Sequence, residues 1–365
     1  MAIKSNYPTF AETFFGKNVF VTGNTGFKGT WLTIWLKQLG ANVFGYSNTR
    51  HTQPSMFLDL EIEAKIKQTY GDISDRESLL ESINSSKPDF IFHLAAQSIV
   101  SESYKSPLET IRTNSFGTAT ILDVMLELDF NGVAVMVTSD KSYENDERNS
   151  GYRETDRLGG RDPYSASKAG AEIFLSTYIR SFFNNSSKQR IGIARAGNVI
   201  GGGDWNANRV IVDCARSWLN REKVTLRNPE ATRPWQHVLE PLSGYLRLAQ
   251  ALLVNEKIHG EAFNFGPNES STYTVNEIVS RFGKYWGHEV VSDHIKLTNQ
   301  KLMYEASLLS LNCEKAAKEL SWSPRLNINE CSKLIADWYL QYESDPSKLL
   351  ELTNDQIKYY ESKEK

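Results

Sequence analysis

The sequence predicts an α/β protein with a Rossmann-like, doubly wound parallel sheet and a smaller, partly interleaved α+β region in its C-terminal half. Two observations predict this fold. Short, continuously apolar runs alternate with amphipathic stretches through residues 1–195, as in parallel strands that helices cover on both faces. A glycine-rich turn, residues 22–29 (TGNTGFKG), also joins the first apolar run to the first amphipathic stretch. Such a turn is typical of the first strand-to-helix connection of these folds.

The expected elements follow from hydrophobic patterning in chain order. Strands are predicted over residues 18–22, 42–46, 89–94, 132–137 and 190–195. Helices are predicted over residues 31–39, near 79–83, over 107–128 and from 162–164 onward. The last of these starts at Asp162-Pro163, and proline is tolerated in the first turn of a helix. The charged tail, 353–365, is expected to be a solvated helix or a frayed end.

Composition limits the classes of function. The chain has 365 residues and a net charge of −3, so no global basic field favours nucleic acid or an anionic membrane. Three scattered cysteines, Cys214, Cys313 and Cys331, argue against a disulfide framework or a metal site and favour a reducing compartment. The N-terminus lacks a signal-peptide core, and no apolar run reaches the roughly 18 residues of a membrane span. We therefore expect a cytoplasmic protein that binds neither nucleic acid nor membrane nor metal.

The glycine turn carries the first functional prediction. Gly23 permits a tight turn, Gly26 lets backbone approach a pyrophosphate, and Gly29 allows close contact between helix and strand. The amides at the helix N-terminus are a ready site for phosphates. The spacing is Gly-x-x-Gly-x-x-Gly, and a plain strand-to-helix turn is the competing interpretation. The predicted dinucleotide-binding residues of this turn are Gly23, Thr25, Gly26, Phe27, Lys28 and Gly29.

Three later segments fit the same dinucleotide. Asp72 and Ile73 follow a plausible strand end, where Asp72 is placed to accept from an adenine amino group. Leu94, Ala95 and Ala96 end another strand in small residues and leave room for ribose or nicotinamide. The second strand ends at Ser47 and Arg50 without the acid that would bind an adenosine ribose. Charge at this position leaves the cofactor as NAD or NADP.

Tyr164 and Lys168 lie four residues apart on a predicted helix and therefore on one face. A nearby cation favours the phenolate of a tyrosine, whose ordinary pKa is about 10. Tyr164 then serves as a base toward a hydroxyl group. Because Tyr-x-x-x-Lys occurs by chance in many helices, the prediction depends on Ser139 at the end of the preceding strand and on the glycine turn.

Together these residues resemble the extended short-chain dehydrogenase/reductases of the NAD-dependent epimerase/dehydratase family. Five segments are similar to its CDP-glucose 4,6-dehydratase subfamily. They are residues 20–29 (FVTGNTGFKG), 138–144 (TSDKSYE), 194–205 (ARAGNVIGGGDW), 233–240 (RPWQHVLE) and 263–266 (FNFG). One departure is Asn24, where the subfamily pattern has histidine. The resemblance implies a dinucleotide-binding Rossmann domain over residues 1–195. It also implies a mainly nucleotide-sugar-binding region over 196–365, some segments of which return to the first domain.

The resemblance also implies a redox-neutral loss of water from CDP-D-glucose through NAD, and roles for the acid–base pair. Tyr164 removes the proton of the sugar 4-hydroxyl while hydride leaves C4. Asp140 is expected to protonate the departing 6-hydroxyl, and Lys141 to remove the C5 proton. A lysine base must be held neutral, by burial or by a neighbouring cation, and Glu144 is an alternative base. A plain surface ion pair is the competing interpretation of Asp140 and Lys141.

The substrate diphosphate needs cations and amide donors. Asn198 and Arg233 match positions that hold the pyrophosphate in this family, Arg209 is a further candidate, and His237 either contacts substrate or packs in the core. The helices over 107–128 and 164–180 commonly build a homodimer in this family, or a dimer of dimers. The alternatives are a nucleotide-sugar 4-epimerase, a 4,6-dehydratase for another nucleotide hexose, and a non-catalytic dinucleotide-binding scaffold or redox sensor.

Overall fold

The structure is a computed structural model of the chain. It describes residues 7–49, 51–148, 150–183, 188–226, 228–268, 273–287 and 308–363, together with the backbone of 295–297. Arg50, one of the predicted cofactor contacts, lies outside the described residues.

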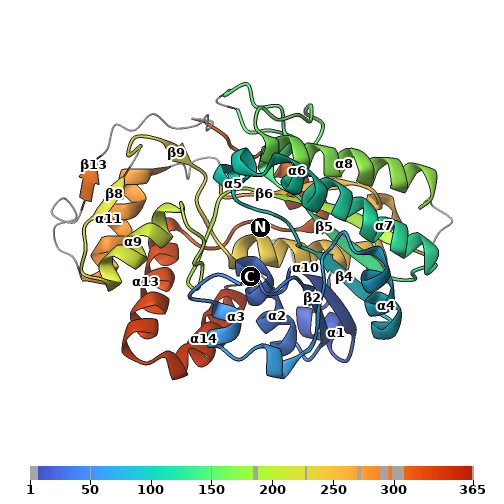
Figure 1. The fold of residues 1–365 in the computed structure, drawn as a ribbon, viewed down its shortest axis with the longest axis horizontal. Coiled ribbons are helices and arrows are strands. Elements are labelled where there is room, and N and C mark those ends of the chain that lie inside the picture. Colours follow the sequence, from blue (N-terminus) through green and yellow to red (C-terminus); the bar gives the residue numbers. More distant parts are fainter. Residues whose placement is uncertain are drawn as a thin grey trace.

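A seven-stranded sheet with parallel pairing throughout forms the centre of the molecule, with strand order β11-β6-β5-β4-β1-β2-β3 (Figure 1). The predicted Rossmann-like doubly wound sheet is therefore confirmed. Its central strands are buried along their length, which explains their unbroken apolar sequences. The strands are β1 (Asn18–Thr22), β2 (Asn42–Ser47), β3 (Lys67–Tyr70), β4 (Phe90–His93), β5 (Val133–Val137), β6 (Arg190–Ala196) and β11 (Ala262–Phe265).

Two hydrophobic cores lie on the two faces of this sheet. One contains the buried side chains of α2 and α10, and the other contains those of α4, α7 and α8. The helices of the first half are α1 (Phe10–Phe14), α2 (Phe27–Gln38), α3 (Met56–Asp59), α4 (Arg76–Ser86), α5 (Val100–Lys105), α6 (Pro107–Ile111), α7 (Gly117–Glu127) and α8 (Pro163–Ser181). α10 (Leu239–Val254) belongs to the later half of the chain.

The predicted elements of the first half are present, with three differences. α2 begins at Phe27, earlier than expected, directly after its N-cap residue Gly26. The helix predicted over 107–128 is divided into α6, a π-helical turn η2 (Arg112–Phe116) and α7. β3 was missed because it lies at the sheet edge and is mostly polar and exposed. It ends directly before Gly71, as the prediction for Asp72 and Ile73 requires.

The chain after residue 196 builds a smaller region that flanks the sheet (Figure 1). Its short strands pair in three two-stranded sheets, β10-β7, β12-β9 and β13-β8. Its remaining helices are α9 (Val210–Leu219), α11 (Val275–Trp286), α12 (Glu314–Leu320), α13 (Ile328–Ser344) and α14 (Leu349–Ser362). Its strands are β7 (Val199–Ile200), β8 (Val224–Leu226), β9 (Thr232–Arg233), β10 (Gln236–His237), β12 (Tyr273–Thr274) and β13 (Ile295–Leu297). β11 pairs with β6, so this part of the chain also supplies an edge strand of the main sheet.

The tail is neither solvated nor frayed as a whole, contrary to the sequence-based expectation. α14 buries Ile357 and Tyr360 completely. The Tyr360 hydroxyl donates to Glu240 Oε2 at 2.6 Å, and Glu240 Oε1 accepts the backbone amides of Arg325 and Leu326. The composition of α14 is misleading because charged residues on its outer face outnumber the few apolar residues that form its buried face.

Replacing this tyrosine tests how much the docking of α14 contributes. Tyr360→Phe removes one donor from the buried Glu240 carboxylate, and we expect the free energy of unfolding to fall by about 1–3 kcal/mol. Tyr359→Phe is the control, because Tyr359 is 41% exposed and its loss is expected to change stability by less than about 0.5 kcal/mol. Urea unfolding measures both, and equal effects would contradict the role of Tyr360.

Candidate active site

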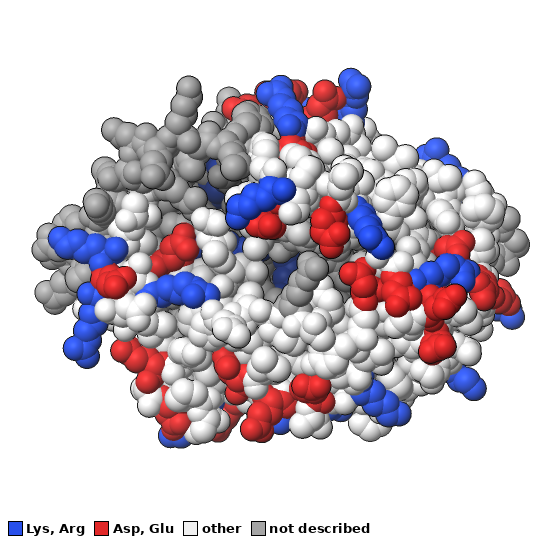
Figure 2. Space-filling model, in the orientation of Figure 1, with Lys and Arg blue, Asp and Glu red and all other residues white. Residues whose placement is uncertain are grey.

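A cleft of about 620 Å³ opens where β5 and β6 end, at the carboxyl edge of the sheet. This edge is the usual ligand site of open parallel sheets. Figure 2 shows acidic and basic side chains interspersed over one face of the molecule, with a hollow near its middle. The cleft brings together eight predicted residues from distant parts of the chain: Lys28, Ser139, Asp140, Lys141, Tyr164, Asn198, Arg209 and Arg233.

The glycine turn has the geometry that a pyrophosphate requires. Gly23 has φ +70°, and a Cβ there would lie 2.7 Å from the Ala95 backbone nitrogen. A Cβ on Gly29 would lie 2.1 Å from the carbonyl oxygen of Gly23. Gly26 caps α2 without a side-chain hydrogen bond to the first-turn amides, which leaves them to a ligand. The turn therefore fits a dinucleotide whose phosphates lie against Thr25, Gly26 and Phe27.

A chain of amide and hydroxyl groups lies beneath the expected adenosine end. Asn24 is fully buried, and its Nδ2 donates to Gln68 Oε1 at 2.7 Å. Gln68 Nε2 in turn donates to Ser47 Oγ at 3.2 Å. Asn24, the departure from the family pattern, thus links the glycine turn to β2 and β3. Asp72 Oδ1 accepts from the amide and hydroxyl of Ser74 at 2.8 and 2.6 Å.

The floor of the same site comes from the end of β4. Ala95 N donates to Thr22 Oγ1 at 3.2 Å, and Leu94 N donates to the carbonyl of Thr22 at 3.1 Å. These bonds hold the 94–96 segment against the glycine turn. Ile73 is buried in the core behind this segment.

The helix α8 presents Tyr164 and Lys168 one turn apart, and both are buried. Asp162 caps its N-terminus through Ser165 N at 2.9 Å. Burial raises the pKa of Tyr164 to about 12, while the neighbouring Ser139 hydroxyl opposes the shift. Burial lowers the pKa of Lys168 to about 8. A positive charge brought beside Tyr164 would lower its pKa, so the arrangement fits a tyrosine that is activated when its cofactor binds.

The turn after β5 places an acid in the cleft. Ser139 caps the short 3₁₀ turn Asp140–Ser142, and its hydroxyl donates to Asp140 Oδ1 at 3.0 Å. Burial raises the pKa of Asp140, and the neighbouring charge of Lys141 partly offsets this. Asp140 Oδ2 has no hydrogen-bond partner among the described residues. A buried carboxyl with a raised pKa and one uncommitted oxygen is suited to donate a proton.

Lys141 and Glu144 lie differently. Lys141 lines the cleft beside Asp140. The Glu144 carboxylate is half-exposed and pairs with Arg157 at 2.9 Å, and Glu144 is not among the residues that line the cleft. This position favours Lys141 over Glu144 as the group that faces a substrate.

The predicted substrate residues separate into two groups. Asn198, Arg209 and Arg233 line the cleft, and Arg209 Nη1 donates to Asp204 Oδ2 at 2.8 Å. His237 is fully buried and does not line the cleft; its ring packs edge-on against Trp31. Burial lowers its pKa to about 3. We therefore assign His237 to core packing.

Some residues that line the cleft could not be predicted from the sequence. The segment after β4 contributes Ser98–Ser101 and Tyr104, and Thr225, Leu226 and Val275 also line the cleft. None of these lies in a motif whose chemistry can be read from spacing. Lys28 is different, because its motif was clear but its side chain reaches Tyr245, where Nζ lies 3.4 Å from the hydroxyl.

Lys28 yields a prediction about stability and pH. Burial lowers its pKa from 10.5 to about 7, so the protonated amine opposes folding. The resulting loss in the free energy of unfolding has its full size below pH 7. It becomes smaller as the pH rises and vanishes near pH 10.5, the ordinary pKa of lysine. Lys28→Met is expected to stabilise the cofactor-free protein by about 2 kcal/mol at pH 6 and by much less at pH 9.5. Urea unfolding at both values measures this, and an equal gain at both would contradict it.

The described residues show neither a metal-binding cluster nor a membrane-spanning helix. No group of three His, Cys, Asp or Glu side chains among them is arranged to hold a metal ion. No helix in the described ranges is long and apolar enough to cross a membrane.

Comparison with known proteins places this site in a family. The chain matches the GDP-mannose 4,6-dehydratase family model over residues 20–335. It is 44% identical over 328 residues to CDP-glucose 4,6-dehydratase of Salmonella typhimurium, covering 89% of this chain and 90% of that protein.

Solved structures agree on the fold. A dTDP-glucose 4,6-dehydratase from Bacillus anthracis in complex with NAD has a TM-score of 0.75 at 20% identity, covering 92% of this chain and all of that one. One from Streptomyces venezuelae with NAD and TYD bound has a TM-score of 0.75 at 21% identity, covering 90% of this chain and 99% of that one. The chain therefore belongs to the GDP-mannose 4,6-dehydratase family of nucleotide-sugar-modifying enzymes.

Proposed function

We propose that this protein is a CDP-glucose 4,6-dehydratase, a hydro-lyase that converts CDP-D-glucose to CDP-4-dehydro-6-deoxy-D-glucose and water with NAD as its cofactor. The 44% identical relative supports the choice of substrate. The observation that carries the chemistry is the wall of the cleft on which Asp140 and Lys141 adjoin Tyr164. A 4-epimerase needs the tyrosine but has no use for an acid and a base at C5 and C6.

The first half of the proposed reaction is an oxidation. The Tyr164 phenolate takes the proton of the sugar 4-hydroxyl while hydride leaves C4, so C4 becomes a ketone. Bound NAD supplies the hydride acceptor. Lys168 and Ser139 hold the tyrosine in place and stabilise its charged form. The predicted contacts to NAD are those described for the glycine turn, with Ser47, Asp72, Ile73, Leu94, Ala95 and Ala96.

The second half is an elimination followed by reduction. The C4 ketone acidifies the C5 hydrogen, and Lys141, acting as the base, removes it. Asp140 gives its proton to the departing 6-hydroxyl, which leaves as water. When bound, NAD would return the hydride to C6 while C5 regains a proton, so that the net change would be the loss of one water. The raised pKa of Asp140 supports its assignment as the acid.

The proposed substrate contacts lie along the same cleft. Asn198, Arg209 and Arg233 are assigned to the pyrophosphate, because charged and amide donors bind phosphate oxygens well. Thr225 and Leu226 line the same cleft, and we place the nucleotide base against them.

The assembly that we propose is a homodimer or a dimer of dimers. Large apolar side chains are exposed on α6, η2 and α8: Leu108 is 80% exposed, Phe116 55% and Ile173 57%. These elements pack against one another, and an exposed apolar patch of this kind is typical of an interface.

We further propose that the enzyme acts in the cytoplasm, where free cysteines persist. Its product would supply a deoxysugar for a surface polysaccharide such as lipopolysaccharide O-antigen.

A substrate panel tests the proposed function. CDP-, dTDP-, UDP- and GDP-hexoses are incubated with the purified protein and NAD, and the near-ultraviolet absorbance of a 4-keto-6-deoxy sugar in alkali is measured. We expect product from CDP-glucose above the other nucleotides. Product from another nucleotide alone would overturn the substrate. An epimer without absorbance would identify a 4-epimerase, and binding of NAD without any turnover would identify a scaffold or sensor.

A further inference from the structure

A buried ion pair beneath the catalytic turn takes no part in the proton and hydride transfers. Glu172 of α8 and Arg195 of β6 have side chains that are only 2% and 5% exposed. Arg195 Nε lies 2.8 and 2.9 Å from the two carboxylate oxygens, and Nη2 also donates to Oε2. Burying two charges is expensive and often adds nothing to stability. The pair therefore calls for an explanation other than stability.

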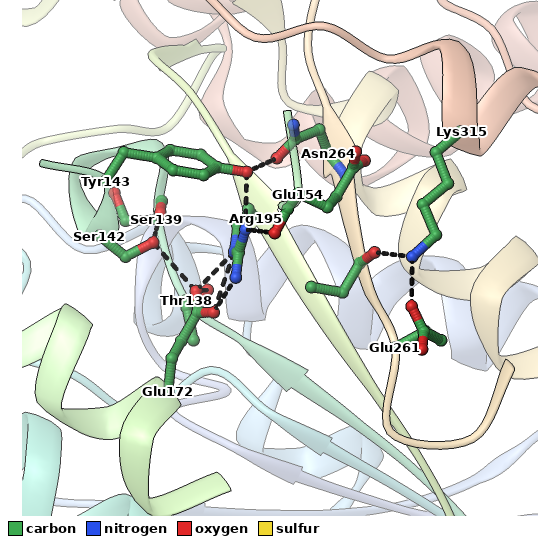
Figure 3. A network of polar contacts seen from close by, with 11 residues as sticks. Thr138, Ser139, Ser142, Tyr143, Glu154, Glu172, Arg195, Glu261, Asn264 and Lys315 are labelled. Atoms are coloured by element: carbon green, nitrogen blue, oxygen red, sulfur yellow. Dashed lines mark hydrogen bonds and ion pairs between the residues drawn. The ribbon is translucent and has the colours of Figure 1, made fainter. Parts of the chain in front are cut away.

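The other contacts of Glu172 supply that explanation. Thr138 Oγ1 donates to its Oε1 at 2.7 Å, and Ser142 Oγ lies 2.9 Å from the same oxygen (Figure 3). Thr138 and Ser142 are the residues on either side of Ser139–Lys141. One carboxylate oxygen thus holds both ends of the segment that carries the acid and the base. The Ser142 hydroxyl also lies 2.7 Å from the Ser139 carbonyl, which closes the turn.

Glu172 also belongs to the helix that carries the oxidising pair. Tyr164, Lys168 and Glu172 are spaced four residues apart on α8, so they lie along one helical face. Helix α8 therefore carries Tyr164 and Lys168, which act in the oxidation. Through Glu172 it also holds the segment with Asp140 and Lys141, which act in the elimination. A shift of about 1 Å in such a relationship can reduce a rate about 100-fold.

Arg195 fixes the other side of the turn. Its Nη1 donates to the Tyr143 hydroxyl at 2.7 Å and to the Glu154 carbonyl at 3.1 Å. The Tyr143 hydroxyl donates to Asn264 Oδ1 of β11 at 2.7 Å (Figure 3). The residue that follows the catalytic turn is thereby tied to the edge strand of the sheet. Of this network only Thr138 lines the cleft; Ser142, Tyr143, Glu172, Arg195 and Asn264 are not among its lining residues.

We propose that Glu172, with Arg195 as its counter-ion, is a positioning residue that fixes the distance and orientation of Asp140 and Lys141 relative to Tyr164. It acts mainly on the elimination half of the reaction, because both Asp140 and Lys141 lie in the anchored segment, whereas the C4 oxidation depends on that segment only through Ser139. The inference rests on the proposed dehydratase function.

The test removes the two hydroxyl groups and keeps the ion pair. Thr138→Val preserves the β-branched shape, and Ser142→Ala changes a side chain that is fully buried. In single turnovers with CDP-glucose, the double variant is expected to form reduced nicotinamide with a loss of no more than about tenfold, because only Ser139 links the turn to Tyr164. Its exchange of the C5 hydrogen with deuterium and its product formation are expected to fall about 100-fold. When Thr138→Ser replaces Thr138→Val in this variant, a hydroxyl group at position 138 is kept. The resulting protein is expected to recover most of the elimination rate.

Thr353→Val is the matched control, since it also removes a buried hydroxyl, which accepts from Trp338 Nε1 at 3.1 Å far from the turn. It is expected to lower stability while leaving the ratio of oxidation to elimination at its wild-type value. Glu172→Gln is the second variant, expected to shift the ratio in the direction of the double variant if it folds.

The outcomes separate the two proposals. Equal losses of oxidation and elimination in the double variant, or no loss at all, would overturn the positioning role and leave the dehydratase intact. A wild-type protein that oxidises CDP-glucose but never releases a 4-keto-6-deoxy product would overturn the dehydratase, and the positioning role with it.

Discussion

Tyr164→Phe is expected to abolish the oxidation of C4 while leaving the fold intact. The ring of Tyr164 is buried and its hydroxyl faces the cleft groups, so phenylalanine keeps the packing and removes only the base. Losing a positioned general base lowers a rate by about 10²–10⁴-fold, which corresponds to about 3–5 kcal/mol of activation free energy. The measurement is the single-turnover appearance of reduced nicotinamide after mixing with CDP-glucose. Circular dichroism and cofactor binding are the controls for folding.

The opposite result would be informative. If Tyr164→Phe still reduces its cofactor at the wild-type rate, another group removes the 4-hydroxyl proton. Lys168 would be the next candidate, because burial already lowers its pKa to about 8. Lys168→Met, which keeps the length of the side chain, would then be the variant that loses oxidation.

Lys141→Ala is expected to separate the two halves of the reaction. The variant oxidises C4, because Tyr164 and Lys168 are unchanged, but it cannot remove the C5 proton. Exchange of the C5 hydrogen with solvent deuterium is expected to fall at least about 100-fold, and reduced nicotinamide accumulates. Mass spectrometry of the recovered sugar measures the exchange.

Two matched variants sharpen this prediction. Lys141→Arg keeps a long side chain that ends in nitrogen but offers no base at neutral pH, so it is expected to behave like alanine in the exchange assay. Glu144→Gln is expected to retain exchange, because the Glu144 carboxylate pairs with Arg157 on the outside of the turn. Retained exchange in Lys141→Arg would refute the base, and lost exchange in Glu144→Gln would restore the alternative.

The order of strands and helices was predictable because parallel strands that are buried on both faces consist of consecutive apolar residues. β1 has the bounds that the sequence indicated. β3 escaped because an edge strand with polar side chains has no such run. The π-helical turn η2 escaped for a different reason, since the apolar spacing through residues 107–128 reads as one continuous helix.

The candidate site was predictable where motifs stand at the ends of strands. The glycine turn and the 139–141 segment could be found in this way, and Tyr164 with Lys168 could be found from their four-residue spacing on a predicted helix. Glu172 was missed, although its spacing from Lys168 was visible, because a buried glutamate needs a partner that only folding reveals. That partner, Arg195, lies on β6. The packing role of His237 was equally hidden, because burial and not sequence distinguishes it from a ligand.

The seventh strand of the sheet emerges from the ribosome last. β11 is an edge strand that pairs with β6, so the outer edge of β6 has no neighbour until residue 265 has been made. Unpaired edges recruit other chains, and nascent chains with open edges are prone to aggregate. Translation that stops between the two strands would release a sheet that lacks only β11, with the edge of β6 exposed, and such a truncated chain is expected to aggregate.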